Sequence, residues 1–156
     1  NSGLMRVGFM GSERMRNYTL LGDNVNLGSR LEGTNKSYGT HIIVSEATFL
    51  QCNHVVHGRL LDAVRVKGKK EPVKIYEIIG KGPMPPLVAS WAGPFEKGFE
   101  HFQAQRWDEA DAAFNAATAA RDGGDPASAI YLERIEHFRA DPPPADWDGV
   151  FEFKTK

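Results

Sequence analysis

The stretch YTLLGDNVNLGSRLEGTNK, Tyr18 to Lys36, decides the fold because its pattern changes at one glycine. The residues YTLL are typical of a strand, and Gly22 ends it. Asp23 or Asn24 is a suitable N-cap for a helix that runs to about Lys36. The stretch therefore predicts a strand followed at once by a helix.

Two pairs of side chains recur four residues apart along this predicted helix. Leu27 and Leu31 supply part of the stripe that would face the core. Asn26 and Arg30 have the same spacing, which places both on one helix face with Cβ atoms about 5–6 Å apart. Arginine offers a planar fork of donors for phosphate oxygens, and asparagine can donate to and accept from a sugar hydroxyl. The pair is a candidate nucleotide site, although on spacing alone a polar surface is the simpler explanation.

The rest of the first 80 residues predicts short elements of both kinds. We expect a strand at 4–9 with a hairpin turn at 11–17, a strand at 40–45, a helix at 45–52 with Ser45 as its cap, and strands at 59–67 and 72–79. The last two are separated by GKKE, which is consistent with an antiparallel pair. Together these elements predict an α+β domain over residues 1–80.

The composition changes after this domain. GKGPMPP suits neither a strand nor a helix, and we place a linker at 81–93. Three helical stretches are expected in a tail at 94–156. The first two repeat apolar residues at i, i+4 and i+7: Phe95, Phe99 and Phe102, then Ala110, Phe114 and Ala117. The dipeptide DP at Asp125 predicts the start of the third, and PPP at 142–144 its end.

Small and aromatic residues in the tail match the spacing of one tetratricopeptide repeat (TPR): Gly98, Ala110, Phe114 and Ala117. A single repeat cannot bury its own apolar face, and arrays usually need about three. A helical appendage that docks on the first domain explains this TPR-like pattern equally well.

Bulk composition excludes several classes of protein. The 156 residues are 41% hydrophobic, and 19 lysines and arginines against 20 acidic residues give a net charge of −1. A net charge this small does not attract nucleic acid or acidic membranes to the protein as a whole, so any anion must be bound by a local group of basic residues. The single cysteine, Cys52, rules out an internal disulfide and fits a reducing, cytoplasmic compartment. No apolar run reaches the roughly 20 residues of a membrane helix.

Three further patterns compete with simpler explanations. The glycine-rich GLMRVGFMGS lacks the lysine that a phosphate-binding loop requires before its serine, so we reject that motif. Cys52, His54 and His57 have no second ligand pair at zinc spacing, and we assign them to a loop. The lysines of VKGKKEP, residues 66–72, fit a solvated hairpin tip, but Lys67 at the strand end could reach a polyphosphate.

The segment MGSERMRNYTLLGDNVNLGSRLEGTNKSYGTHIIVSEAT closely resembles the catalytic domain of class III nucleotidyl cyclases, the adenylate and guanylate cyclase family. Its motif YT-x-x-G-D-x-V-N-x-x-S-R-L-E is long and ordered, and RLLDAVRVKGKKEPVKIYEI resembles the last strands of that domain. The resemblance spans about residues 1–80 and implies the C-terminal portion of a ferredoxin-like α+β domain. The helical part resembles the tail that follows this domain in bacterial adenylate cyclases with a sensor domain.

The resemblance implies that ATP is converted to cyclic AMP and pyrophosphate when its ribose 3′-hydroxyl attacks the α-phosphate. Asn26 would orient the ribose, and Arg30 would stabilise the charge that grows on the α-phosphate. Lys67 would bind the terminal phosphates. Thr19 stands where the family contacts the purine, and threonine favours adenine there. Two divalent ions, Mg²⁺ or Mn²⁺, would be held by two aspartates and activate the attack.

The family also implies what this chain lacks. Both metal-binding aspartates and the residue that completes purine choice belong to strands that would precede Asn1, so the metal ligands are expected upstream and this piece alone would be inactive. Family active sites form across a head-to-tail dimer, in which this segment would supply Asn26 and Arg30. We therefore expect ATP and a second protomer as partners, no nucleic acid, and a membrane only through upstream regions.

Alternatives remain open at this point. The parent protein could be a guanylate cyclase, or a catalytically silent cyclase-like module that dimerises or senses nucleotide. The helical tail could instead make the chain chiefly a protein-interaction element.

Overall fold

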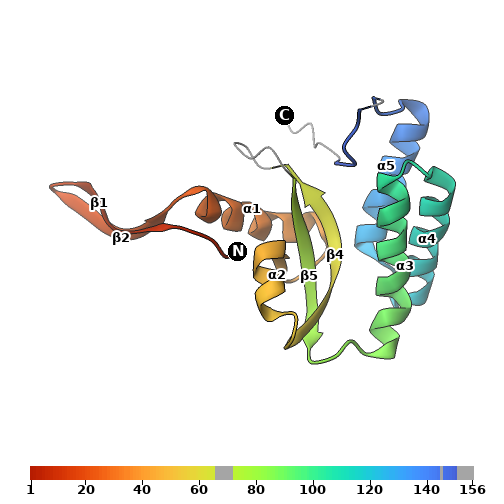
Figure 1. Cartoon of the computed structure of the whole chain (residues 1–156), viewed down its shortest axis with the longest axis horizontal. Coiled ribbons are helices and arrows are strands. Elements are labelled where there is room, and N and C mark those ends of the chain that lie inside the picture. The colour runs from red at the N-terminus through yellow and green to blue at the C-terminus, as the bar shows by residue number, and fades with distance from the viewer. Residues whose placement is uncertain (66–71, 145, 151–156) are drawn as a thin grey trace.

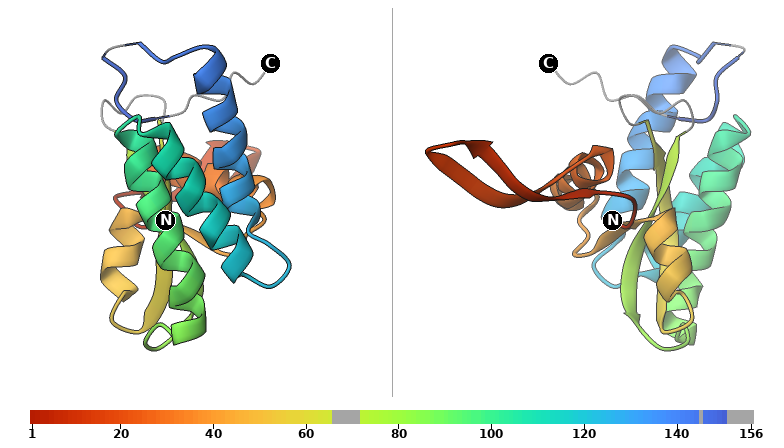
Figure 2. Two further views of the ribbon diagram at one scale, coloured as in Figure 1. Left: turned by 90° about the vertical axis from the view of Figure 1, so that its right-hand side faces the viewer. Right: turned by 60° about the vertical axis from the view of Figure 1, so that its left-hand side comes forward.

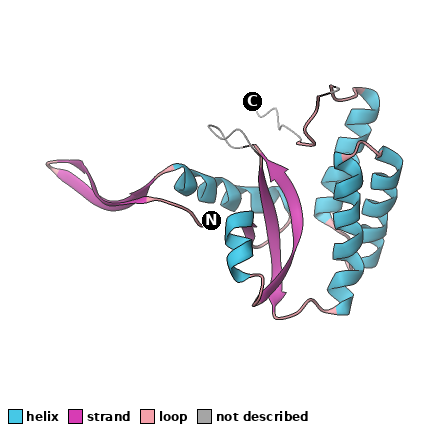
Figure 3. Ribbon diagram, viewed as in Figure 1, coloured by secondary structure: helices cyan, strands magenta, loops and turns pink. Residues whose placement is uncertain are grey.

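A computed structural model describes the chain at residues 1–65, 72–144 and 146–150. Figure 1 shows the path of the chain, and Figure 3 separates its helices from its strands. The elements are β1 (Arg6–Ser12), β2 (Met15–Leu21), α1 (Asp23–Tyr38), β3 (Ile43–Ser45), α2 (Glu46–Cys52), β4 (Val56–Val64), β5 (Val73–Lys81), α3 (Pro86–Gln103), α4 (Trp107–Ala120) and α5 (Pro126–Ala140). The expected α+β class is confirmed.

Antiparallel pairing connects the strands. β1 and β2 form a two-stranded hairpin, and β3, β5 and β4 form a three-stranded sheet in that order. The expected antiparallel pair at 59–67 and 72–79 is confirmed as β4 and β5. The GKKE segment between them lies outside the described residues. β3 is shorter than the strand expected at 40–45.

Helices cover both faces of the three-stranded sheet. Figures 1 and 2 show α1 and α2 on one side and α3 to α5 on the other. Leu61, Asp62 and Ala63 are consecutive in β4 and at most 5% exposed, because both faces of the strand are covered. One cluster of buried side chains extends from α1 through the sheet to α5 and Val150. The helical part therefore continues the core of the first 80 residues.

The hairpin of β1 and β2 corrects the expected turn. Its strands reach Ser12 and Met15, so the turn consists of Glu13 and Arg14 instead of residues 11–17. Every residue of β2 is exposed. The strand expected at 18–21 lies within β2, but because both faces are exposed, no alternation of apolar and polar residues extended that expectation back to Met15.

The beginning of α1 corrects the expected N-cap. Gly22 occupies the cap position with φ of 142°, a region that glycine adopts freely. Asp23 is instead the first helical residue, where its charge is favourable near the positive end of the helix dipole. Asn24 is already inside the helix, and its Nδ2 donates to the carbonyl of Leu4 at 3.1 Å. Neither side chain caps the helix.

α3 begins inside the segment expected to be a linker. The helix starts at Pro86, and Pro94, the expected start, lies within it. A proline is tolerated in the first turn because its missing N–H has no partner there. The helix-breaking residues of 81–93 therefore mark the beginning of a helix rather than a long irregular connection.

The apolar patterns of the helices agree with the expectation. All six residues that recur at i, i+4 and i+7 are buried: Phe95, Phe99, Phe102, Ala110, Phe114 and Ala117. Asp125 caps α5 by accepting a hydrogen bond from the backbone N–H of Ser128 at 3.0 Å, and α5 ends before the prolines at 142–144. Across the described ranges, no helix combines the length and apolar character that crossing a bilayer requires.

Candidate functional site

Helix α1 carries Asn26 and Arg30 on its solvent-exposed side. Both residues are exposed, whereas the adjacent Leu27 and Leu31 are each 2% exposed and belong to the core. Among the residues that the structure describes, none forms a hydrogen bond or ion pair with either polar side chain. The carboxamide and the guanidinium therefore keep their donors and acceptors available for a ligand.

The N-terminal residues hold the first turn of α1. Asn1 donates from Nδ2 to the backbone carbonyl of Asn24 at 2.8 Å, and Ser45 donates from Oγ to Asn1 Oδ1 at 2.5 Å. Asn24 in turn donates to the carbonyl of Leu4. These contacts connect the turn that carries Asn26 to the chain before β1 and to the end of β3.

Residues that sequence reasoning missed hold the other end of α1. Tyr38 is 1% exposed, donates its hydroxyl hydrogen to Asp62 of β4, and accepts a hydrogen bond from Arg134 Nη2 of α5 at 2.8 Å. Burial, followed by the neighbouring Asp62 charge, raises the pKa of Tyr38 well above its usual value. Tyr38 lies at i+7 from Leu31, so the helical period could have placed it on the buried stripe. Nothing in the local sequence indicates its two partners.

The other two predicted site residues lie on other elements. Thr19 is exposed on β2, opposite Gly8 of β1. Figure 1 shows this hairpin extending away from the three-stranded sheet and joining the body where α1 begins. The structure thus brings Asn26 and Arg30 together on one helix and places Thr19 on the hairpin. Lys67 lies outside the described residues.

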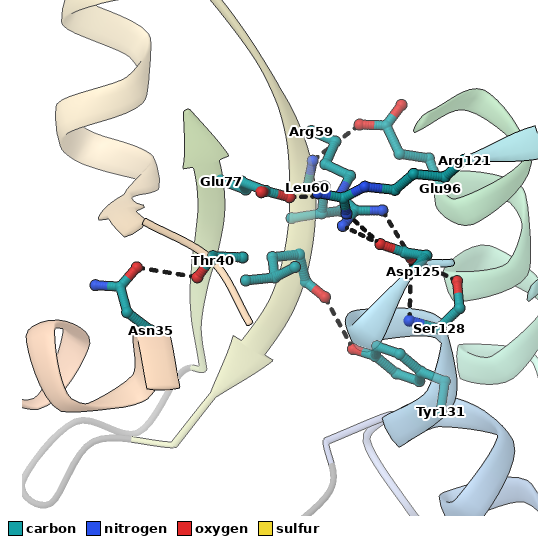
Figure 4. Close-up of polar contacts among 11 residues, drawn as sticks. Asn35, Thr40, Arg59, Leu60, Glu77, Glu96, Arg121, Asp125, Ser128 and Tyr131 are labelled. Carbon is teal, nitrogen blue, oxygen red and sulfur yellow. Dashed lines mark hydrogen bonds and ion pairs between the residues drawn. The ribbon is translucent and has the colours of Figure 1, made fainter. Parts of the chain in front are cut away.

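A buried ion-pair network joins β4 to α5 on the other face of the sheet (Figure 4). Arg59 is 0% exposed and donates from Nη1 and Nη2 to the two carboxylate oxygens of Asp125 at 3.0 and 2.7 Å. Its Nε donates to Glu77 at 2.8 Å, and its guanidinium lies 4.2 Å from the ring centre of Phe95. Of this network, the sequence predicted only the helix cap, Asp125.

The electrostatics of Asp125 follow from this arrangement. Burial by itself raises the pKa of its carboxyl, but hydrogen bonds from Arg59 and the charge of Arg59 outweigh burial, with further hydrogen bonds from Ser128 and Arg121. The net pKa lies below the usual aspartate value, so the carboxylate is ionised at neutral pH. The network is a structural connection between layers, and it lies across the sheet from α1.

The described residues, 1–65, 72–144 and 146–150, contain no cluster of three metal-ligating His, Cys, Asp or Glu side chains. Cys52 donates from Sγ to the carbonyl of Thr48 at 3.3 Å, and His57 Nδ1 lies 3.1 Å from the carbonyl oxygen of Gly82. His54 and His57 line a hollow beside α2 that does not include the polar pair of α1.

A family model and two sequence relatives all relate this chain to nucleotidyl cyclases. Residues 1–80 match the family described as the adenylate and guanylate cyclase catalytic domain. Adenylate cyclase 1 of Rhizobium meliloti (strain 1021) is 41% identical over 80 residues, which cover 51% of this chain and 12% of that protein. The terminal-differentiation-specific adenylate cyclase of Dictyostelium discoideum is 31% identical over 142 residues, which cover 86% of this chain and 6% of that protein.

One further sequence relative and one solved structure are also similar to this chain. An adenylate cyclase of Anabaena cylindrica is 39% identical over 79 residues, which cover 49% of this chain and 16% of that protein. The crystal structure of the adenylyl cyclase CyaB from P. aeruginosa is 32% identical, with a TM-score of 0.41 over 48% of this chain and 37% of that chain. The chain thus spans between 6% and 16% of the length of these three curated relatives.

Proposed function

Because the chain belongs to the family of adenylate and guanylate cyclase catalytic domains, we propose that it is part of an adenylate cyclase. The three curated relatives described above are named adenylate cyclases. The observation that carries the proposal is the exposed pair of Asn26 and Arg30 on α1, whose side chains have no partner in the described part of the chain. The activity of the whole protein would be the conversion of ATP to cyclic AMP and pyrophosphate.

In this reaction the ribose 3′-oxygen loses its proton and forms a bond to the α-phosphorus, while the bond from that phosphorus to the oxygen of pyrophosphate breaks. Asn26 would hold the ribose so that the 3′-oxygen faces the α-phosphate. Arg30 would donate to the non-bridging oxygens, where negative charge develops in the transition state. Both donors lie on one helix face, so they can contact neighbouring parts of one nucleotide.

Two more residues would recognise the ends of ATP. The hydroxyl of Thr19 would contact the purine, and threonine favours adenine at this position of the family pattern. Lys67 would bind the terminal phosphates as a flexible point charge. We therefore favour an adenylate cyclase over a guanylate cyclase.

The metal ions, Mg²⁺ or Mn²⁺, would be held by the two aspartates that the family implies, which are expected upstream of residue 1. When bound, such ions neutralise phosphate charge and lower the pKa of the attacking hydroxyl. A second protomer in a head-to-tail dimer would bring these ligands opposite Asn26 and Arg30. The catalytic part would then be cytoplasmic, where ATP is available.

We also propose that residues 1–80 form the end of a ferredoxin-like domain and that α3 and α4 are a TPR-like helical pair. The close contact between these helices supports the second assignment, because a Cβ on Gly98 would lie 2.8 Å from the ring of Phe114.

Product analysis of the full-length protein tests the proposed function. We expect cyclic AMP from ATP with Mg²⁺ or Mn²⁺, and a much lower rate with GTP. Cyclic GMP as the main product would instead identify a guanylate cyclase. Nucleotide binding without either product would identify a catalytically silent module.

A further inference from the structure

Helix α5 reaches the C-terminal end of α1 through three polar side chains. Tyr38 is the last residue of α1, Asp62 lies on β4 and Arg134 lies on α5. Arg134 donates from Nη1 to Asp62 Oδ2 and from Nη2 to Tyr38 Oη, each at 2.8 Å. The Tyr38 hydroxyl donates to the same Asp62 oxygen, so each residue of the triad contacts the other two.

The triad is almost completely removed from water. Tyr38, Asp62 and Arg134 are 1%, 2% and 3% exposed. Hydrogen bonds to charged groups are stronger than neutral ones, and a low local dielectric strengthens them further. They also depend steeply on distance and angle. The triad therefore fixes where the end of α1 lies relative to β4 and α5.

Between the hydrogen bonds at its first turn and this triad, α1 is held by apolar side chains. Leu27 and Leu31 pack in the core, and apolar contacts are not directional. Tyr38 continues the same stripe and adds directional contacts to it. Asn26 and Arg30 each precede one of the two leucines by one residue. Any rotation or sliding of α1 in its seat would therefore displace the carboxamide and the guanidinium together.

At this end of α1 the backbone also lies close to the start of α5. Gly39 follows Tyr38 and has φ of 62°, and a Cβ there would lie 2.8 Å from Cβ of Pro126 at the start of α5. The end of α1 thus contacts α5 through both a glycine and a buried tyrosine.

We propose that Tyr38, Asp62 and Arg134 are positioning residues through which α5 sets the placement of Asn26 and Arg30 for cyclisation. The inference rests on the proposed function, and it makes the helices after residue 80 part of the catalytic unit. The Dictyostelium match is consistent with this role, because a similarity over 86% of the chain necessarily extends beyond residues 1–80.

Two tyrosine substitutions in the full-length enzyme test this role. Tyr38→Phe removes the hydroxyl between α1 and the other two residues but leaves Asp62 paired with Arg134. Tyr131→Phe is the control for losing a buried hydroxyl beside the same triad. Tyr131 is 0% exposed, its hydroxyl donates to the carbonyl of Leu61 at 3.0 Å and lies next to Asp62, and its ring lies 4.7 Å from the Arg134 guanidinium. The phenylalanine keeps this ring contact, and the hydrogen bonds of Tyr38 stay in place. Both variants lose one buried hydroxyl beside Asp62, but only Tyr38→Phe removes hydrogen bonds that α1 itself makes.

We expect Tyr38→Phe to lower kcat per active site about tenfold with KM for ATP changed less than about twofold, because small misplacements of catalytic groups cost rate. Tyr131→Phe should retain kcat within about twofold. In hydrogen exchange, amides of α1 should exchange faster in Tyr38→Phe than in Tyr131→Phe, while those of α4 should be alike in both.

Equal losses of kcat in the two variants, or unchanged α1 exchange in Tyr38→Phe, would overturn the inference. These outcomes differ from a failure of the proposed function, in which the wild-type protein forms no cyclic AMP. In that case the exchange comparison alone decides whether α5 holds α1.

Discussion

Arg30 stands on an exposed helix face beside Asn26, and its side chain has no partner among the described residues. A guanidinium in this setting is suited to a charge that appears during the reaction. An interaction that is stronger in the transition state than with bound substrate raises kcat and changes KM little.

We therefore expect Arg30→Ala in the full-length enzyme to lower kcat by about 10²- to 10³-fold, the usual effect of removing one donor to a developing oxyanion. KM for ATP should change far less. Lys36→Ala is the matched control, because Lys36 is another exposed cation on α1. Steady-state kinetics would contradict the role of Arg30 if both variants retained similar turnover.

Local spacing was sufficient to pair Asn26 with Arg30, because both lie on one helix. The same reasoning could not find the contacts of Tyr38. Its partner Asp62 is 24 positions away, and Arg134 is 96 positions away. No periodicity relates residues on three different elements, so these contacts follow only from the tertiary packing.

The type of each helix and strand was predictable, whereas the turn of the exposed hairpin and the start of the proline-rich helix were misplaced. β5 and the apolar stripe of α1 agree with their patterns because burial of one face imposes a period on the sequence. Both strands of the β1–β2 hairpin were expected, but the hairpin has no buried residue to mark where the strands end, so its turn was placed too widely. The start of α3 was missed because proline both breaks helices and favours their first turn.

The contact between α3 and α4 gives a prediction about stability. Gly98→Ala would place a Cβ 2.8 Å from the buried ring of Phe114, and overpacking of this kind costs about 1–3 kcal/mol. Gly33→Ala is the control. Gly33 lies on α1, and a Cβ there would meet no neighbouring atom within 4 Å. Urea unfolding should show a lower midpoint for Gly98→Ala and an equal or higher one for Gly33→Ala. A Gly98→Ala variant as stable as Gly33→Ala would contradict the close packing.

On the scale of the whole molecule, two buried polar networks join the helices of residues 86–140 to the sheet. One connects Arg59 with Asp125, and the other connects Asp62 with Arg134. A shared core runs through the same interface. The helical part and the first 80 residues are therefore expected to unfold together.

The lowered pKa of Asp125 predicts how this interface responds to acid. A carboxyl with a lower pKa in the folded state stabilises the fold above the ordinary aspartate pKa of about 3.9, and this stability is lost as the pH falls through the folded-state value. Asp125→Asn should cost about 3 kcal/mol at pH 7, because it leaves Arg59 buried with fewer partners.

Urea unfolding at neutral pH and near pH 3 measures this difference. The difference in unfolding free energy between wild type and Asp125→Asn should be smaller near pH 3 than at neutral pH. Asp108→Asn is the control, because its ion pair with Arg139 is exposed, and its midpoint should stay close to that of the wild type. A gap that is independent of pH would show that the charge of Asp125 does not stabilise the fold.

The central claim is that α1 supplies Asn26 and Arg30 to a nucleotide whose metal ions are held by another protomer. The most direct test mixes two full-length proteins with little or no activity of their own, Arg30→Ala and a variant without the metal-binding aspartates that the family implies. In a symmetric dimer, mixed pairs regain one complete site, so equal amounts should recover about a quarter of wild-type cyclic AMP formation. No recovery in mixtures shown to contain mixed dimers would contradict the claim.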